Sequence, residues 1–562
     1  MKQSIVYTIT ANCQDCYRCV RACPVKAIKV TSGQAQISSE LCIMCGTCVR
    51  ECPQGAKKIH SSLDSAKELV NSNRLTVVSL APSFSAIFAG EFAHRLPSAL
   101  RRLGFDYIHE TAEGAKLITE LSFEKDVQGN ICTACPAIVN YVEKYKPEFA
   151  NIFIPIVSPM IAHGRLLKAQ YPDCAVIFIG PCSAKKHEAL RTENVGVIDV
   201  VLTFDELLQW FSQEDISLDY CSESGFDNRC EIGTARLFPL QGGMLNTGGL
   251  LLNGAESNVL HLSGSEDVLS LFDGEFNFGE NLKLTEALFC KGGCINGAGI
   301  TNEKNFFERR RNVIDYSNTL HRDIVQERPK IDFKAVFMPS LETQLQVPKH
   351  KIDKILEQTG KLDPAFQLNC GACGYKTCID NAVAVAKRMA EISMCMPYMR
   401  RLAQQRTDII IETMPSGVVI LDSGLCILKM NPAFKKMFMC NDSILGRRIS
   451  YLLNADGFEK IMQGETERYE SIAQKYGIKY HEVLYPLRED EQYVGIYSDI
   501  SNIKYDQSKL DVIKSQTLMH AREFLDHQIK FSQEMANYLG LSTAKSEEIA
   551  MRLINLYEDT QK

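Results

Sequence analysis

The sequence predicts a multidomain protein that combines α/β and α+β folds, and three observations lead to this prediction. The chain has 562 residues, too many for one hydrophobic core and enough for about three to five domains. Its cysteines gather in separate groups along the chain. Apolar segments in its middle alternate with segments of helical periodicity. The expected parts are residues 1–60, 75–330, 331–400, 405–505 and 506–562.

Composition narrows the class of protein. The chain has 22 cysteines, and because a reducing compartment disfavours disulfides, metal ligation explains them better. The net charge of -6 provides no basic surface for a phosphate backbone, so nucleic acid is not an expected partner. No apolar run reaches the roughly 18 residues that span a bilayer, and no apolar leader precedes Cys13. We therefore expect a cytoplasmic protein without membrane contact.

Residues 1–60 contain two C-x-x-C-x-x-C-x-x-x-C-P runs that lie 29 residues apart. Their cysteines are Cys13, Cys16, Cys19 and Cys23, then Cys42, Cys45, Cys48 and Cys52. The spacing is typical of two electron-transferring 4Fe-4S clusters, with zinc as the alternative. The segment resembles the ferredoxin-like two-cluster fold, which implies crossed ligation. One cluster would take Cys13, Cys16, Cys19 and Cys52, and the other Cys42, Cys45, Cys48 and Cys23.

Residues 75–330 contain apolar runs at 75–80, 175–179 and 198–202, which predict buried parallel strands of an α/β domain. Ligands of such sheets bind at the carboxyl ends of the strands. Pro82 and Ser83 follow the first run, and Cys182 follows the second. These positions are candidate cofactor contacts.

Three segments of this domain carry its most specific motifs: Cys-Thr-Ala-Cys-Pro at 132–136, the loop 180–188, and residues 286–297 around Cys290 and Cys294. In this order, behind a ferredoxin-like segment, they resemble the three signatures of the iron-only (FeFe) hydrogenases. The resemblance implies a two-lobed α/β domain that binds the H-cluster. This cofactor joins a 4Fe-4S cubane to a two-iron (2Fe) centre with carbon monoxide, cyanide and azadithiolate ligands.

The same resemblance implies roles for individual residues. Cys294 would also bridge to the two-iron centre, Lys185 would hydrogen-bond a cyanide ligand, and Glu188 would orient their loop. Pro82, Ser83 and Ser158 are the other expected cofactor contacts. The cubane ligands would be Cys135, Cys182, Cys290 and Cys294.

Several positions in this domain depart from the family pattern, among them Ala134, Ile138, Met160, Gly180 and Leu288. Ala134 stands where active members have a cysteine that relays protons, and Met160 stands where glutamine is usual. A methyl group cannot relay a proton, and general acid-base groups contribute about 10² to 10⁴ in rate. We therefore expect an enzyme of low activity. Its candidate catalytic positions are Cys294, Lys185, Glu188, Ser83 and Met160, with Ala134 as the lost proton relay. The alternative is that Cys132, Thr133 or water relays the proton instead.

Residues 331–400 contain Cys370, Cys373, Cys378 and Cys395, with a helix expected over 379–394. This segment resembles the four-cysteine iron-sulfur domain of corrinoid and carbon monoxide dehydrogenase systems. The resemblance implies one more 4Fe-4S cluster, with zinc as the alternative.

Residues 405–505 begin with two apolar strands across an Asp-Ser-Gly turn, and further strands are expected at 479–484 and 493–500. This pattern resembles a PAS domain. Apolar residues at heptad-like intervals follow in 506–562, which predicts a helical signalling or dimerisation tail.

Together these parts predict a hydrogen- and redox-sensing FeFe hydrogenase of low turnover, which passes electrons through its clusters and a signal through the PAS domain. The alternatives are a competent ferredoxin-linked hydrogenase and a non-catalytic iron-sulfur scaffold. Expected partners are hydrogen and protons, ferredoxin or another redox protein, a signalling kinase or phosphatase, and a second copy of the chain through the PAS domain and tail.

Overall fold

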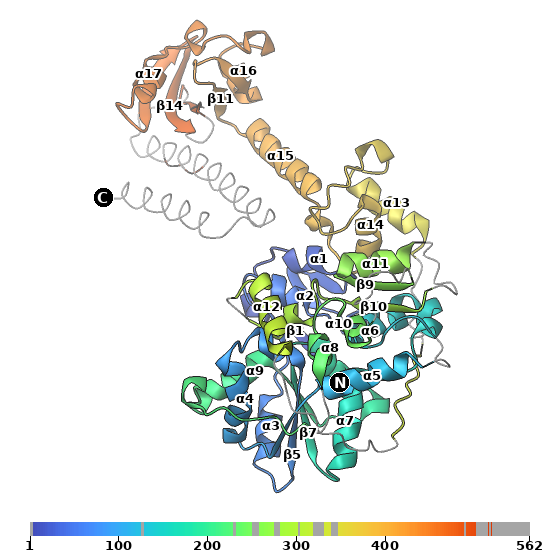
Figure 1. Cartoon of the computed structure of the whole chain (residues 1–562). Helices are drawn as coiled ribbons and strands as arrows, with labels where there is room; N and C mark the ends of the chain where they lie inside the picture. The colour runs from blue at the N-terminus through green and yellow to red at the C-terminus, as the bar shows by residue number, and fades with distance from the viewer. Residues whose placement is uncertain are drawn as a thin grey trace. The chain divides into compact units, whose positions relative to one another are not determined.

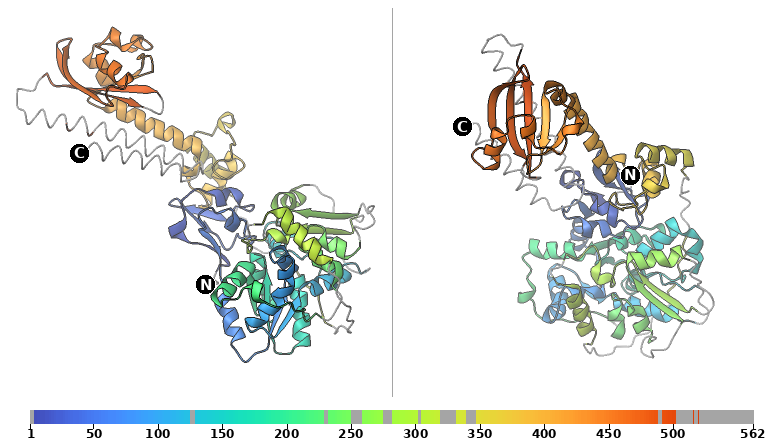
Figure 2. Two further views of the ribbon diagram at one scale, coloured as in Figure 1. Left: turned by 60° about the vertical axis from the view of Figure 1, so that its left-hand side comes forward. Right: turned by 90° about the horizontal axis from the view of Figure 1, so that it is seen from above.

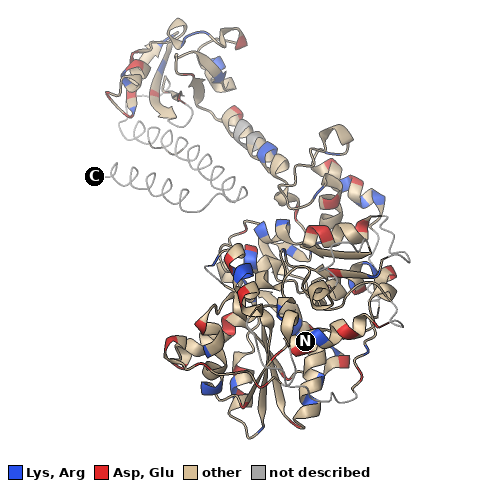
Figure 3. Ribbon diagram, in the orientation of Figure 1, with Lys and Arg blue, Asp and Glu red and all other residues tan. Residues whose placement is uncertain are grey.

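The computed structural model of the protein describes residues 4–124, 129–228, 232–249, 258–274, 282–301, 304–318, 331–338, 347–487 and 491–501, with Ser515 and Met519. The chain divides into two compact units, Met1–Glu391 and Ile392–Lys562. The predicted helices of 506–562 lie outside the described residues, apart from those two positions. Acidic and basic residues are interspersed along the ribbon of both units (Figure 3).

The first unit begins with the cysteine-rich segment, which contains two small antiparallel hairpin-like pairs. β1 (Val6–Thr8) pairs with β4 (Lys57–Ile59), and β2 (Ile28–Thr31) pairs with β3 (Gln34–Ile37). Two short helices, α1 (Arg18–Ala22) and α2 (Thr47–Glu51), each carry the third cysteine of a run and end just before the fourth. The two cysteine runs therefore have the same local backbone arrangement.

A four-stranded parallel sheet forms the core of the next part and confirms the predicted α/β fold. Its strands are β5 (Thr76–Leu80), β6 (Tyr107–Glu110), β7 (Ala175–Gly180) and β8 (Val200–Thr203), in the order β6-β5-β7-β8. β5 and β7 are buried throughout, as strands covered on both faces should be. The chain leaves β5 toward one side of the sheet and returns to β7 on the other, which makes their carboxyl ends a topological switch point.

Helices cover both faces of this sheet (Figures 1 and 2). They are α3 (Leu63–Val70), α4 (Glu91–Arg102), α5 (Ala112–Ser122), α7 (Pro159–Gln170) and α9 (Phe204–Gln213). Sequence explains where two of them begin. Ser158 caps α7 and Thr203 forms a capping box with Glu206 at the start of α9, which satisfies amide groups that the helices leave open.

A second parallel pair, β9 (Val259–Ser263) and β10 (Leu284–Leu288), supports the other lobe of this domain. The helices around it are α6 (Pro136–Tyr145), α8 (Ser183–Ala189), α10 (Gly243–Thr247), α11 (Ser265–Asp273) and α12 (Phe306–Ser317). Among the described helices of the chain, none is long and apolar enough to cross a membrane.

The unit ends with α13 (Lys349–Gln358) and α14 (Cys378–Ala386). The helix predicted over 379–394 is therefore wrong in its second half. Arg388 has a left-handed φ of 57°, and the carbonyl of Met389 accepts a hydrogen bond from Val30 at 2.9 Å. The chain leaves the helix because its backbone pairs with β2 instead.

The second unit begins with α15 (Met396–Thr413) and continues into a five-stranded antiparallel sheet. Its strands are β11 (Gly417–Leu421), β12 (Ile427–Met430), β13 (Tyr469–Lys475), β14 (Ile478–Leu487) and β15 (Gln492–Asp499), in the order β12-β11-β15-β14-β13. α16 (Pro432–Met437) and α17 (Asp456–Met462) pack on one face through Phe434 and Phe458. The end of α15 packs on the other face through Ile411 and Met414. Figure 2 shows these strands side by side.

Candidate functional site

Four cysteines of the central domain come from four places in the chain. Cys135 precedes α6, Cys182 precedes α8, Cys290 follows β10, and Cys294 begins a short turn that ends at Asn296. Burial and, to a smaller extent, the charge of the neighbouring Cys135 raise the pKa of the Cys182 thiol to about 11. Burial also raises the pKa of Cys290 and Cys294, to which the charges of the other cysteines of the set add. The four thiols therefore lie within electrostatic reach of one another.

This electrostatic environment suits a metal cluster. Several thiolates cannot share a buried site without a cation, because burial and mutual repulsion both favour the neutral thiols. A polynuclear iron centre supplies that positive charge and binds thiolate sulfur. The donor set thus fits the cubane that the sequence predicts here.

The backbone around Cys294 is held by close contacts that only glycine permits. Gly293 has a φ of 105°, and a side chain there would collide with the carbonyl of Pro239. A side chain on Gly297 would collide with the carbonyl of Pro181, next to Cys182. Gly297 therefore lets the segment of Cys294 pack against the segment of Cys182, and Gly293 lets it pack against the backbone of Pro239.

Lys185 lies in the first turn of α8 and is buried together with both of its partners. Its Nζ lies 2.7 Å from Oε2 of Glu188 and 2.8 Å from Oγ of Ser158. An ammonium group in such surroundings is a strong hydrogen-bond donor to an anion. Its charge also acts on Cys182 and Cys294, lowering the pKa of both thiols against the larger effect of burial. The structure thus places the predicted cyanide-binding lysine beside the predicted cubane ligands.

Pro82 and Ser83 lie in the turn that follows β5, at the switch point of the sheet. Within the described part of the chain, the buried hydroxyl of Ser83 has no hydrogen-bond partner. Buried polar groups are normally satisfied, so an orphaned hydroxyl at a strand end indicates a group that the protein alone does not supply. This agrees with the prediction that Ser83 contacts a cofactor.

Two of the positions that depart from the family pattern, Ala134 and Met160, are buried. Ala134 is 9% exposed and Met160 is fully buried at the start of α7. The sulfur of Cys132 accepts a hydrogen bond from the amide of Ala134 at 3.4 Å. Burial raises the pKa of the Cys132 thiol to about 12, to which the neighbouring Glu286 contributes. Cys132 is therefore poorly suited to exchange protons near neutral pH.

Glu286 is a buried acid that sequence reasoning did not select. It lies in β10, and its carboxylate accepts hydrogen bonds from the amides of Gly242, Met244 and Leu245 at 3.1, 3.1 and 3.3 Å. Burial nevertheless raises its pKa to about 7. A glutamate within the short segment Leu284–Leu288, whose other residues carry no charge, was the signal that could have identified it.

The cysteines of the first segment form two crossed groups. A pocket is lined by Cys13, Cys16 and Cys19 of the first run together with Cys52 of the second. The charges of Cys45, Cys23 and Cys42 all act on Cys48 and, after burial, raise its pKa. The structure thus groups each fourth cysteine with the other run, in the arrangement that the resemblance to ferredoxins implies.

The second of these groups lies next to the cysteines of the central domain. The charge of Cys45 acts on Cys290, and that of Cys135 acts on Cys45. Direct contacts join the segments, because the hydroxyl of Ser183 donates to the carbonyl of Met44 at 2.7 Å. Cys42, Cys45, Cys48 and Cys23 are therefore the group that adjoins the central site.

The cysteines of 367–378 adjoin the first segment. Arg21 donates to the carbonyls of Cys16 at 3.0 Å and Ala372 at 3.4 Å. Cys373 and Cys23 both act on the ring of Tyr375, whose pKa burial and these charges raise. Cys378 accepts a hydrogen bond from Lys361 at 3.3 Å. Cys370 is exposed, and Cys395 lies in the second unit, ahead of α15.

Comparison with known proteins identifies the parts of the chain. Residues 74–298 match the family of the iron-only hydrogenase large subunit, C-terminal domain. Residues 5–68 match a 4Fe-4S dicluster domain, residues 367–397 an Fe-S cluster family, and residues 403–471 a PAS domain.

Curated relatives fall into two groups. The NADP-reducing hydrogenase subunit HndD of Solidesulfovibrio fructosivorans is 24% identical over 298 residues, which is 41% of this chain and 51% of that protein. Iron hydrogenase 1 of Clostridium pasteurianum is 25% identical over 300 residues, 42% and 52% of the two chains. A cytosolic Fe-S cluster assembly factor of Kluyveromyces lactis is 38% identical over 92 residues, 16% and 19% of the two chains.

This chain therefore spans about half the length of the two hydrogenase relatives. A solved structure of a variant FeFe-hydrogenase from Chlamydomonas reinhardtii covers 47% of this chain and 91% of its own, with 19% identity and a TM-score of 0.36. The family matches, taken with the curated hydrogenases, show that residues 74–298 form an iron-only hydrogenase-like domain, and that the chain also contains a 4Fe-4S dicluster domain, an Fe-S cluster segment and a PAS domain.

Proposed function

We propose that this chain is a hydrogen- and redox-responsive sensor built on an FeFe-hydrogenase site of low turnover. The observation that carries the proposal is that four cysteines within electrostatic reach of one another, with Lys185 acting on two of them, adjoin Ala134, which directly precedes Cys135. The cysteine set and the Lys185 contacts are those that a hydrogenase site needs, whereas the side chain at 134 cannot move a proton.

The cofactor would be the H-cluster, and the residues present fit it. Cys294 would bridge the cubane to the two-iron centre, Lys185 would donate to a cyanide ligand, and Ser83 would use its orphaned hydroxyl for a second ligand. The cubane ligands would be Cys135, Cys182, Cys290 and Cys294. When bound, the group supplies the heterolytic cleavage and formation of hydrogen. The residues of the chain position it, exclude water and control proton access.

The expected low turnover follows from the lack of a side chain at position 134 that can transfer protons. Cys132 is the nearest thiol in sequence to Ala134 that is not an expected cluster ligand, but its pKa of about 12 opposes proton exchange near neutral pH. The loss of a proton-transferring group costs about 10² to 10⁴ in rate. A sensor tolerates this loss, because its output depends on the state of the site rather than on the rate of product release.

The electron path would run through the adjoining cysteine groups. Cys45 connects the ferredoxin-like segment to the central site, and Cys23 connects it to the Fe-S segment of Cys373. A cytoplasmic ferredoxin or another redox protein would exchange electrons with these clusters. The PAS domain would pass the signal to a kinase or phosphatase, and it would dimerise with a second copy of the chain.

A second candidate function has one observation in its favour. The fungal assembly factor is more similar to this chain, at 38% identity, than either hydrogenase, although over only 92 residues. A non-catalytic iron-sulfur scaffold would explain Ala134 equally well. The scaffold function would not explain why Lys185, Ser158 and Glu188 form a buried polar group next to the cysteines.

Infrared spectroscopy of anaerobically matured protein separates these functions. Bands of iron-bound carbon monoxide and cyanide, with about eighteen irons per chain, would support the hydrogenase site. Their absence from protein with filled cubanes would instead establish the scaffold. Where the bands are present, a hydrogen turnover close to that of cysteine-containing hydrogenases would rule out the sensor in favour of the competent enzyme.

A further inference from the structure

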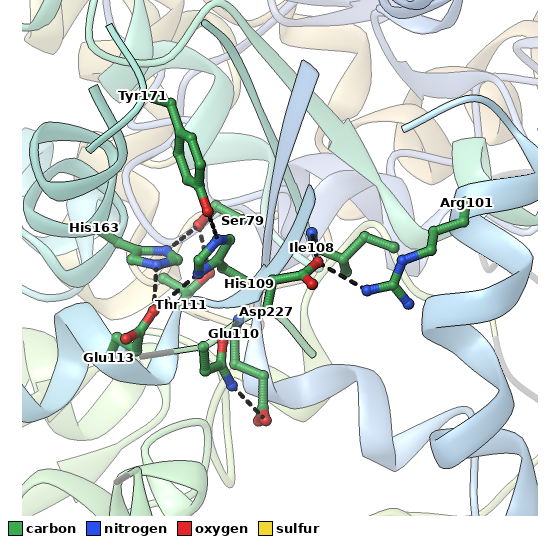
Figure 4. A network of polar contacts seen from close by, with 11 residues as sticks. Ser79, Arg101, Ile108, His109, Glu110, Thr111, Glu113, His163, Tyr171 and Asp227 are labelled. Atoms are coloured by element: carbon green, nitrogen blue, oxygen red, sulfur yellow. Dashed lines mark hydrogen bonds and ion pairs between the residues drawn. The ribbon is translucent and has the colours of Figure 1, made fainter. Parts of the chain in front are cut away.

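Two histidines and a glutamate meet in the core of the central domain (Figure 4). His109 comes from β6, Glu113 from the first turn of α5, and His163 from α7. Oε2 of Glu113 lies 3.3 Å from Nδ1 of His109 and 3.2 Å from Nε2 of His163. The two imidazole rings therefore direct one nitrogen each at the same carboxylate oxygen.

The second nitrogen of each ring is held by a hydroxyl. Nε2 of His109 lies 3.2 Å from the hydroxyl of Tyr171, and Nδ1 of His163 lies 2.7 Å from that of Ser79. Ser79 in turn lies 2.8 Å from the hydroxyl of Thr111. Histidines that bind metals are usually oriented in this way, by a hydrogen bond from the nitrogen that faces away from the ion.

The separations fit ligands that share one ion. Two atoms bound to Zn²⁺ at about 2.0–2.1 Å in a tetrahedral arrangement are about 3.3 Å apart. The three ligand atoms also lie within 4.8 Å of one another. When both ring N–H groups point toward Tyr171 and Ser79, the two bare nitrogens and the carboxylate oxygen of Glu113 face one another as acceptors. A cation between them would satisfy all three.

We propose that His109, Glu113 and His163 bind one divalent first-row transition-metal ion, with Zn²⁺ as the best fit to two nitrogens and a carboxylate. The fourth position would go to water or to the second oxygen of Glu113. The ion differs from the irons of the clusters, because no thiol takes part in the cluster of ligands and nitrogen and oxygen donors suit zinc.

The ion would fasten α5 to α7. At Gly114 a side chain would collide with the carbonyl of Pro159 and with His163, so the two helices already pack with no space for a larger residue. α7 begins at Ser158, whose hydroxyl bonds Lys185. The ion would therefore stabilise the helix that presents Ser158 to the predicted hydrogenase site.

The test uses the full chain with its clusters in place. The protein is exposed anaerobically to equimolar Zn²⁺, passed through a desalting column and analysed for zinc by mass spectrometry. Wild type should retain about one ion, and Glu120→Gln, at the exposed end of the same helix, should retain the same amount. Glu113→Gln and His163→Gln should lose it, while Tyr171→Phe should weaken binding about ten-fold.

X-ray absorption at the zinc edge of the wild-type protein tests the site even when the variants do not fold. A shell of nitrogen and oxygen at about 2.0–2.1 Å in the wild type supports the site, whereas sulfur at about 2.3 Å places the ion on cysteines and overturns it. Retention of no more zinc by the wild type than by Glu113→Gln also overturns it.

Discussion

Lys185 and Glu188 form a buried ion pair at 2.7 Å within one turn of α8, directly after Cys182. Breaking a buried pair by removing one partner costs about 3–5 kcal/mol, because the other charge stays behind without compensation. Removing the ammonium group of Lys185, which we expect to bind the cofactor, should therefore also destabilise the first turns of α8.

Replacing Lys185 with glutamine should remove the two-iron centre and leave the cubane. We expect infrared bands of carbon monoxide and cyanide to be lost after maturation, with cubane iron unchanged. Lys186→Gln is the matched control, because Lys186 is also buried and paired, with Glu206 at 2.9 Å. Both variants should lose thermal stability, but Lys186→Gln should keep the bands. If both keep them, Lys185 has no role in binding the cofactor.

Replacing Ala134 with cysteine should raise hydrogen evolution by about 10²-fold or more, because it restores a group that can pass protons at the site. Ala137→Cys places a thiol on the adjoining buried turn of α6 and should leave the rate unchanged. Rates are compared per two-iron centre, measured by infrared intensity. An unchanged rate in Ala134→Cys would show that proton delivery does not limit turnover.

Much of this organisation could be predicted from local patterns in the sequence. The cysteine spacings fix the ferredoxin-like segment, and the apolar runs locate β5, β7 and β8 to within two residues at each end. The sequence also predicted β11, β12, β14 and β15 of the PAS domain, because turn residues lie between short apolar runs there, but it did not predict β13.

Features that depend on contacts between distant segments could not be predicted from the sequence. The helix predicted over 379–394 ends at Ala386, because Met389 pairs with Val30 more than 350 residues earlier. Glu286 was not selected, since its amide partners come from α10. His109 and Glu113 are near neighbours in the sequence, but only the packing of α5 on α7 brings His163 to them.

The raised pKa of Glu286 predicts a pH-dependent stability. Its ordinary value is 4.5 and its folded value is about 7. Between these values the folded state keeps the proton that the unfolded state loses, so rising pH favours unfolding, by about 3 kcal/mol in all. Glu286→Gln should match the wild type in melting temperature near pH 5 and exceed it near pH 8. The exposed Glu266→Gln should show no such difference, and equal melting temperatures of Glu286→Gln and wild type at both pH values would contradict the raised pKa.

The hydrogen bonds of Asn431 predict that the stability of the PAS domain depends strongly on this side chain. Its buried side chain accepts hydrogen bonds from the amides of Val418 and Phe434, both at 2.8 Å, and donates to the carbonyls of Ile411 at 2.9 Å and Ser416 at 2.8 Å. Asn431→Ala strands these groups and should cost about 3 kcal/mol, equivalent to about a 100-fold loss of hydrogen-exchange protection.

Exchange measured by mass spectrometry on the whole chain would locate this loss in residues 417–434. Asn441→Ala removes an exposed cap of a short turn and should cost only about 0.5–1 kcal/mol. Equal protection of 417–434 in the two variants would mean that the Asn431 contacts do not hold the sheet.

The adjacency of Cys45 to Cys135 and Cys290 predicts the order of electron transfer. Cys23→Ser should remove the cluster of the second run and Cys52→Ser that of the first, each with a loss of about four irons. Under hydrogen, the remaining ferredoxin-type cluster should then stay oxidised in Cys23→Ser, because the cluster next to the central site is missing, but become reduced in Cys52→Ser. Paramagnetic resonance of frozen samples distinguishes the two outcomes. Equal reduction in both variants would show that electrons reach the first-run cluster without passing through the second, and the path inferred from these contacts would be wrong.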